Sequence, residues 1–210
     1  MPQTSTSIAS PACFKTQVAN LLHTVAQFLV RRRILLTAML FTGLIVEDVV
    51  TGVKPHDLAN WRDPVVVGGV LAIVLGVALR SWAVGILRKD AELTMTGPYR
   101  LIRNPLYLGS FLMMAGFCIL IDDHENVLCI LLPMALIYTI KVRREEQLLS
   151  SLFPAQWTEY VRSTPRFIPR LARVNLSATW SGARWLGCRE YHALVATAAA
   201  LIALKAWQMA

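Results

Sequence analysis

The sequence predicts an all-α, polytopic integral membrane protein with about five transmembrane helices, and two observations lead to this fold class. Of the 210 residues, 55% are hydrophobic and 16% are charged, with a mean hydropathy of +0.49, whereas a soluble domain carries about 25% charged residues. The apolar residues also gather in runs close to the ~17–25 residues of a membrane-spanning helix. A soluble bundle of buried helices is the alternative that composition leaves open.

The placement of basic residues predicts the orientation of these helices. Basic clusters, such as those at 31–33 and 141–144, flank one end of the apolar runs, whereas a loop at the other end, 122–125, is acidic. The positive-inside rule then places the N-terminus in the cytoplasm and the C-terminus outside. No nucleic-acid partner is expected, because the charges form no single stripe. The expected spans are 34–53, 64–87, 105–121, 126–140 and 190–208.

The rest of the chain is expected to surround one membrane core over residues 34–170. Residues 1–33 are expected to form a tail and an amphipathic helix, lying at the membrane interface or packed on the cytosolic part. Residues 171–210 are expected to form an interfacial segment and an extra transmembrane helix. The four cysteines and four histidines are scattered without metal-binding spacing, so no disulfide framework and no metal are expected.

Residues 97–110, GPYRLIRNPLYLGS, predict a helix start. Asparagine is a preferred N-cap and proline is favoured at the first helical position, so Asn104 is expected to cap a helix that begins at Pro105. The amide groups at such an end, with Arg100 and Arg103 nearby, attract an anionic group. The plainer interpretation is a capped membrane helix whose arginines only set its orientation.

A second polar segment, KVRREEQLL, covers residues 141–149. Lys141 and Glu145 stand four residues apart and therefore share one helix face. A run of solvated salt bridges is the usual meaning of such a stretch. However, one motif opens an outgoing span and the other closes the returning span, so a tight hairpin brings both to one membrane face. A helix N-terminus with arginines and carboxylates then suits a zwitterionic, amino-acid-like headgroup.

Arg80 interrupts the second apolar run, ~12 Å from its expected inner end at ~1.5 Å per residue. An arginine inside a membrane span is costly and marks function by default. We expect it to pair with the carboxylate of an acceptor or with a lipid phosphate. The alternative is snorkelling toward the inner headgroups.

Taken in order, GPYRLIRNPLYLG and RREEQLLSSLFPAQWTEYVRSTPRFIP resemble the isoprenylcysteine carboxyl methyltransferase family and the related membrane phospholipid methyltransferases, over about residues 65–169. The family pattern is GxYxxxRHPxYxG, then a glutamate pair, then a segment ending in PRFIP. The resemblance implies S-adenosylmethionine as cofactor, bound in a pocket at the cytoplasmic face. It also implies a lipid-like, hydrophobic or prenylated acceptor that enters from the bilayer.

The resemblance also assigns site residues. Lys141 matches a basic position that touches substrate, and we group it with Arg80 and Glu146 as candidate catalytic residues. Arg103 is added to the cofactor pocket for its charge. The positions that match the family's cofactor pocket are Leu93, Thr94, Tyr99, Asn104, Pro105, Leu106, Tyr107, Glu145 and Glu146.

Departures from the family pattern leave the methyl acceptor open. Asn104 stands where the family has a histidine, and asparagine cannot carry a proton. Ala91 and Pro154 also replace residues that family members have. O-methylation is favoured, because a carboxylate acceptor needs no base, and phospholipid N-methylation is the alternative. An NADPH-dependent membrane reductase with a related cofactor cradle and a non-catalytic membrane protein are the other classes. The sequence specifies neither the oligomeric state nor the choice between a plasma or inner membrane and the endoplasmic reticulum.

Overall fold

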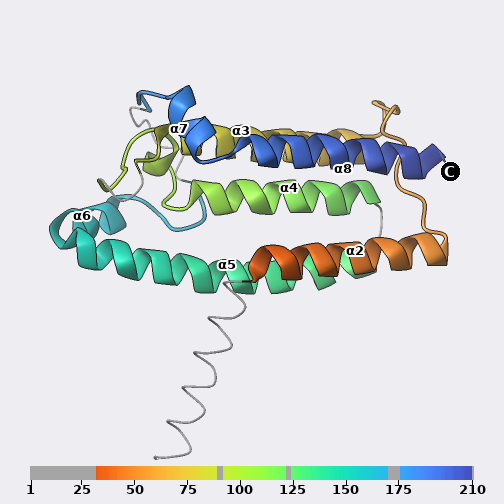
Figure 1. Cartoon of the computed structure of the whole chain (residues 1–210), viewed down its shortest axis with the longest axis horizontal. Coiled ribbons are helices and arrows are strands. Elements are labelled where there is room, and N and C mark those ends of the chain that lie inside the picture. The colour runs from red at the N-terminus through yellow and green to blue at the C-terminus, as the bar shows by residue number, and fades with distance from the viewer. Residues whose placement is uncertain (1–31, 89–91, 122–123, 170–175, 210) are drawn as a thin grey trace, which may run out of the picture.

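The computed structural model describes residues 32–88, 92–121, 124–169 and 176–209, and within these ranges it contains helices and no strand. The long helices run side by side along the longest axis of the molecule (Figure 1). The amphipathic helix expected before residue 34 falls on residues outside the described ranges. The helices are α2 (Arg33–Thr51), α3 (Pro64–Ile86), the short 3₁₀ helix η1 (Gly97–Arg100), α4 (Pro105–Ile121), α5 (His124–Leu152), α6 (Pro154–Ser163), α7 (Gly182–Gly187) and α8 (Tyr191–Met209).

The helices α3, α4 and α6 each begin at a proline, a residue that carries no backbone N–H and suits the first helical turn. The side chain of Asp63 accepts a hydrogen bond from the N–H of Val65 at 2.8 Å and so caps α3, which begins at Pro64. Helix α4 begins at Pro105, as the sequence predicts. Helix α5 differs from the expected span 126–140, because it continues through the charged run to Leu152.

Two of the described helices, α3 and α8, are long and apolar enough to cross a membrane, and α4 is a shorter apolar helix. The number of five spans and their orientation stay predictions. The apolar character of these helices agrees with the expected class, since their side chains are largely exposed: Leu71 on α3 and Ile202 on α8 are 53% and 70% exposed.

Helices α3 and α4 pack backbone against backbone through glycines spaced seven residues apart on each helix. A Cβ atom added at Gly76 would lie 2.6 Å from the carbonyl oxygen of Gly109. A Cβ atom at Gly116 would lie 2.6 Å from the carbonyl oxygen of Gly69. Small residues permit such close approach between apolar helices. We call this contact the glycine seam, and it makes α3 and α4 one rigid pair.

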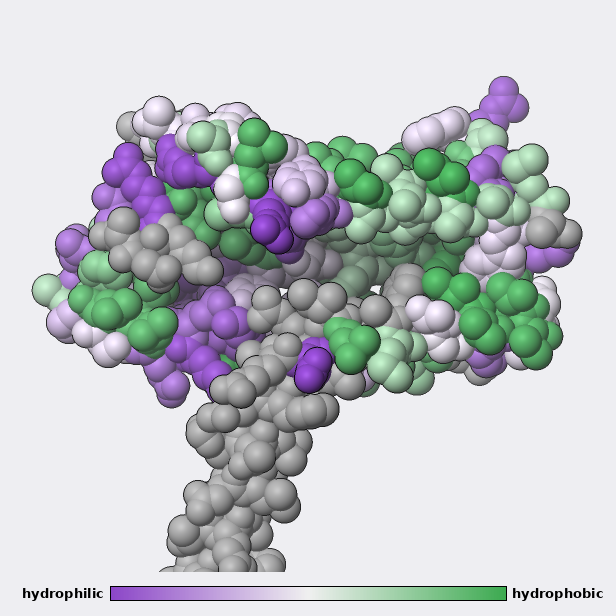
Figure 2. All heavy atoms as spheres, viewed as in Figure 1, coloured by the Kyte–Doolittle hydropathy of each residue, from purple (hydrophilic) through white to green (hydrophobic). Residues whose placement is uncertain are grey.

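The connections η1, α6 and α7 lie with the start of α4 at one end of the long helices, which we call the polar end (Figure 1). Figure 2 shows hydrophilic residues gathered there, whereas hydrophobic residues cover much of the long helices. The polar end holds both sequence motifs, because α4 starts there and α5 carries residues 141–149 toward α6.

The segment before α7 packs on the end of α3. The indole N–H of Trp180 donates to the Ser81 carbonyl at 3.0 Å, and the backbone N–H of Ser181 donates to the Gly85 carbonyl at 2.9 Å. Arg184 donates from Nη1 to the Ile86 carbonyl at 2.8 Å. Carbonyl groups in the last turn of a helix lack intrahelical partners. This segment therefore supplies hydrogen-bond donors to carbonyl groups at the end of α3.

Candidate active site

The start of α4 and the second half of α5 meet at the polar end. The carbonyl of Asn104 accepts from the N–H of Leu108 at 3.2 Å, and its side-chain amide donates to Glu146 Oε1 at 3.1 Å. The Tyr107 hydroxyl, one turn along α4, donates to Glu145 Oε1 at 2.9 Å. The predicted proximity of the two motifs is therefore confirmed.

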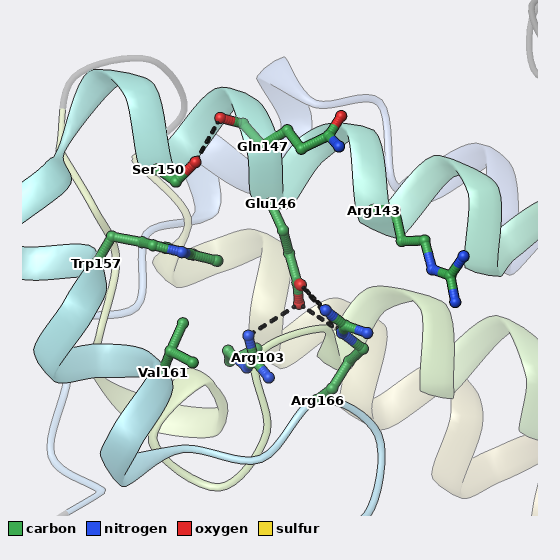
Figure 3. A pocket seen from close by; sticks show the side chains of 8 residues that line it. All are labelled: Arg103, Arg143, Glu146, Gln147, Ser150, Trp157, Val161 and Arg166. Atoms are coloured by element: carbon green, nitrogen blue, oxygen red, sulfur yellow. Dashed lines mark hydrogen bonds and ion pairs between the residues drawn. The ribbon is translucent and has the colours of Figure 1, made fainter. Parts of the chain in front are cut away.

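Glu146 is the buried centre of an ion cluster with Arg103 and Arg166 (Figure 3), and the side-chain amide of Asn104 joins it; we call these four residues the Glu146 cluster. Its Oε2 lies 2.5 Å from Arg166 Nη2 and 3.0 Å from Arg166 Nε, and its Oε1 lies 3.3 Å from Arg103 Nη1. Only 7% of Glu146 is exposed. A buried carboxylate is tolerated when it is paired and hydrogen-bonded in this way.

Helix α6 and the loop after it hold this cluster in place. The backbone N–H of Arg103 donates to the Pro165 carbonyl at 2.9 Å. The Tyr160 hydroxyl donates to the Tyr99 carbonyl at 2.7 Å. The Arg103 guanidinium lies 5.8 Å from the centre of the Trp157 ring, within the range of a cation–π contact. Helix α6 is thus tied to η1, and the PRFIP segment (residues 165–169) is tied to the residues just before α4.

Glu145 belongs to a more open group with Tyr107 and Lys141, which we call the Glu145 group. Lys141 Nζ lies 2.9 Å from Glu145 Oε1, as the four-residue spacing predicts. The Glu145 side chain is 40% exposed, against 8% for Glu146. The Tyr107 ring packs edge-on against Tyr138 with centroids 5.3 Å apart, which fixes the direction of its hydroxyl.

A pocket of about 340 Å³ opens beside the Glu146 cluster, within the range of small-molecule sites. Figure 3 shows Glu146 reaching from α5 toward two arginines, with the Trp157 ring to one side. Three arginines and one carboxylate give the pocket an excess of positive charge, which favours an anionic ligand group. The lining residues are Arg103, Arg143, Glu146, Gln147, Ser150, Trp157, Val161 and Arg166.

Tyr99 is 7% exposed, and its hydroxyl makes no hydrogen bond within the described part of the chain. Burial raises the pKa of this phenol above its usual value, and nearby ionisable groups, among them Glu145 and Glu190, add to the rise. The phenol therefore stays protonated at neutral pH and is a buried hydrogen-bond donor. A buried donor without a partner is costly and points to a ligand acceptor.

The other residues that the sequence predicted for the cofactor pocket do not line this pocket. Leu93, Thr94 and Pro105 are buried, and Leu106 is partly buried. The Thr94 hydroxyl accepts from the backbone N–H of Arg88 at 3.1 Å, so it closes the turn after α3.

Arg80 lies apart from both groups and pairs with a residue of the C-terminal segment. Its Nε lies 2.7 Å from Glu190 Oε1 and its Nη2 lies 2.9 Å from Glu190 Oε2. Its Nη1 donates to the Ser110 hydroxyl. The pairing partner expected for this arginine from the sequence was a ligand, and in the structure the position is filled by the protein's own carboxylate.

The sequence analysis assigned no role to Arg166, Trp157 or Glu190. Arg166 lies in the PRFIP segment that carried the resemblance, so its motif was a usable signal. Glu190 is the acidic residue directly before the last apolar run, and an unpaired intramembrane arginine calls for such a partner.

Comparison with known proteins identifies the family of the chain. The family model described as phospholipid methyltransferase matches residues 65–156. The cobalt-zinc-cadmium resistance protein CzcN of Cupriavidus metallidurans is 31% identical over 166 residues, covering 78% of this chain and 76% of that protein. The nickel-cobalt-cadmium resistance protein NccN of Alcaligenes xylosoxydans xylosoxydans is 30% identical over 155 residues, covering 73% and 72%.

The chain belongs to the phospholipid methyltransferase family. Membership in a membrane methyltransferase family, together with the apolar helices α3 and α8, associates it with a membrane. The matched range ends before Arg166 and Glu190, so the partner of Glu146 and the partner of Arg80 both lie beyond the family model. No solved structure matches the chain. The described residues contain no group of three or more His, Cys, Asp or Glu side chains arranged to hold a metal ion.

Proposed function

We propose that this phospholipid methyltransferase-family protein transfers a methyl group from S-adenosylmethionine to a hydrophobic, membrane-borne acceptor at the cytoplasmic face. The observation that carries the proposal is the direct contact of the start of α4 with the paired glutamates of α5, Tyr107 to Glu145 and Asn104 to Glu146. This contact brings the two motifs of the family pattern together beside a pocket that Glu146 lines.

The residues at the polar end fit the charges of the cofactor. Arg143 and Arg103 line the pocket and suit a carboxylate, and Trp157 offers a flat ring for a purine. The exposed carboxylate of Glu145 suits an ammonium group. The unpartnered Tyr99 hydroxyl is a further donor. Once bound, S-adenosylmethionine supplies a methyl group on a positively charged sulfur.

The side chains favour an acceptor that is already ionised. Methyl transfer mainly requires the acceptor and the methyl carbon to be aligned. An amine acceptor also needs a base. Tyr99 stays protonated because its pKa is raised, and Glu146 is paired with two arginines, so Glu145 is the available base. Isoprenylcysteine-type O-methylation is therefore preferred, and phospholipid N-methylation through Glu145 is the alternative.

Calorimetric titration of the purified protein in a neutral detergent tests the cofactor. S-adenosylmethionine and its demethylated product should bind with heat release, and NADPH should not. Binding of NADPH alone would support the reductase, and binding of none of the three would support a non-catalytic membrane protein. Transfer of a radiolabelled methyl group into a total lipid extract, followed by identification of the product, then tests the acceptor.

The names of the two relatives suggest a physiological setting in addition to the chemistry. They refer to resistance to cobalt, zinc, nickel and cadmium. If this protein acts in the same setting, deletion of its gene should lower growth in one of these metals. Restoration by the wild-type gene and not by a Glu145→Gln variant would connect the resistance to the proposed site. Unchanged growth of the deletion strain would contradict the setting.

A further inference from the structure

Three polar residues at the start of α4 lie between the Glu145 group and Arg80. Asn104, Tyr107 and Ser110 are three residues apart, so each step turns by roughly 60° around a helix of 3.6 residues per turn. The first two residues contact α5, and Ser110 contacts Arg80 on α3. Arg80 is therefore within one helical turn of Tyr107 along α4.

Tyr99 is a second link between the two places. Its buried hydroxyl has no hydrogen-bond partner in the described chain, and the charges of Glu145 and of Glu190 both act on it. Both carboxylates thus raise the pKa of the same buried phenol without a hydrogen bond to it.

The geometry around Arg80 suits a carboxylate. Two oxygens of Glu190 face two nitrogens of one guanidinium, at 2.7 and 2.9 Å. This side-on arrangement matches a planar carboxylate. The Ser110 hydroxyl contacts the third nitrogen. Glu190 is 6% exposed, whereas the Arg80 side chain is 23% exposed, so the carboxylate is shielded from water and the guanidinium is partly accessible.

The backbone that carries Glu190 turns from α7 into α8 and is held by two hydrogen bonds, from the N–H of Arg189 to the Leu186 carbonyl at 2.9 Å and from the N–H of Glu190 to the Trp185 carbonyl at 3.3 Å. Arg189 has a φ of 55°, a left-handed conformation that residues other than glycine rarely adopt. Helix α8, which follows, has most of its surface exposed. Its far end is attached by an ion pair of 3.1 Å between Lys205 and Asp57 and by the packing of Leu204 in the core. Movement of the Glu190 side chain away from Arg80 therefore requires neither a change in this turn nor a change in the glycine seam.

We propose that Arg80 and Ser110 bind the carboxylate of an acidic, hydrophobic acceptor, and that Glu190 is a built-in competitor that fills this site between turnovers. The inference rests on the proposed methyl transfer and names its substrate class. It also gives the C-terminal segment a role, since Glu190 lies beyond the range that the family model matches.

The exchange also favours product release. A carboxylate oxygen of the acceptor forms a bond to the methyl carbon, the carbon–sulfur bond breaks, and its electron pair stays on sulfur; no proton moves. The product is an uncharged methyl ester, which is a weaker partner for a guanidinium than a carboxylate is. Glu190 then pairs with Arg80 again and displaces the methyl ester from the site.

Amphiphile binding without cofactor tests this proposal. Dodecanoate, methyl dodecanoate and dodecyl phosphate are titrated into the protein in a neutral maltoside detergent. Glu190→Gln should bind dodecanoate at least 10-fold more tightly than wild type and leave methyl dodecanoate unchanged. Adding Arg80→Gln should remove the gain. Glu159→Gln, which changes an exposed carboxylate on α6, is the matched control and should behave as wild type.

Two outcomes would overturn the proposal. One is no gain in dodecanoate affinity for Glu190→Gln, or an equal gain for acid and ester, because Glu190 would then only neutralise Arg80. The other is a larger gain for dodecyl phosphate than for dodecanoate, which would indicate a lipid phosphate.

If Glu190→Gln does not fold, Glu190→Asp should give a smaller gain, about 3-fold, with the same selectivity. Failure of S-adenosylmethionine to bind, with this gain intact, would contradict only the methyl transfer.

Discussion

Glu145 and Glu146 are neighbours in the sequence, yet they have opposite surroundings. Glu146 is enclosed by two arginines and an asparagine, whereas Glu145 is 40% exposed and touches one lysine and one tyrosine. Adjacent residues on a helix point about 100° apart, so one faces the PRFIP loop and the other faces α4. The two glutamates therefore differ in role: Glu146 stabilises the packing of the charged residues around it, and Glu145 is accessible to a ligand.

Glu146→Gln should have the largest effect of the changes that test this division. It leaves Arg103 and Arg166 next to each other without a carboxylate, and removal of one partner of a buried pair costs about 3–5 kcal/mol. Because Arg166 is 39% exposed, we expect the lower end of this range. Thermal unfolding in detergent measures it. The double variant with Arg166→Gln should lose less than the sum of the single changes; a fully additive loss would contradict the cluster.

Glu145→Gln should leave the melting temperature close to that of wild type and lower the affinity for S-adenosylmethionine by about 10–100-fold. A hydrogen bond to a charged group contributes about 1.5–3 kcal/mol, and ~1.4 kcal/mol is a factor of ten. Calorimetric titration gives the affinity, with Glu159→Gln as control. A loss of stability as large as that of Glu146→Gln would show that the two glutamates are equivalent.

Tyr107→Phe should lower the same affinity by a smaller factor, about 3–10-fold, because it removes only the neutral donor that orients Glu145. Its effect depends on Glu145. In a Glu145→Gln background the change should therefore have little further effect on affinity. If it weakens binding equally in both backgrounds, Tyr107 acts on the ligand directly.

The smallest effect concerns pH. Burial raises the pKa of both Tyr99 and Tyr160 well above the ordinary value of about 10. In the unfolded chain these phenols lose protons first, so above pH ~10 the unfolded state binds fewer protons and stability falls as pH rises. Spectrophotometric titration of the folded protein near pH 10–11 should be the same for wild type, Tyr99→Phe and Tyr160→Phe. A smaller amplitude in either variant would contradict the burial.

The helix starts and the meeting of the two motifs were predictable because their causes are local. Proline after a capping residue fixes where α3 and α4 begin, and the four-residue spacing of Lys141 and Glu145 fixes their contact. The end of α5 was not predictable in this way. Charged residues were interpreted as the exit from a membrane, but a helix does not have to stop where its surroundings become polar.

The partners of the buried charges could not be predicted from local sequence patterns. Arg166 is 20 residues from Glu146, and Glu190 is 110 residues from Arg80. No periodicity connects positions at such separations. The sequence therefore predicts that the charges need partners, and only the fold decides which residues these are.

The glycine seam has a consequence for how a bulky, chain-like molecule can enter. With Gly76 and Gly109 in backbone contact, α3 and α4 have no room to separate, and Arg80 lies against this contact. We therefore expect entry from the side of α8, which is held at its far end by the packing of Leu204 and by the ion pair of Lys205 with Asp57. Alanine at Gly76 would force the two helices apart, and alanine at Gly109 would in addition displace the Arg80 side chain, whose Cγ lies 2.6 Å from the added Cβ.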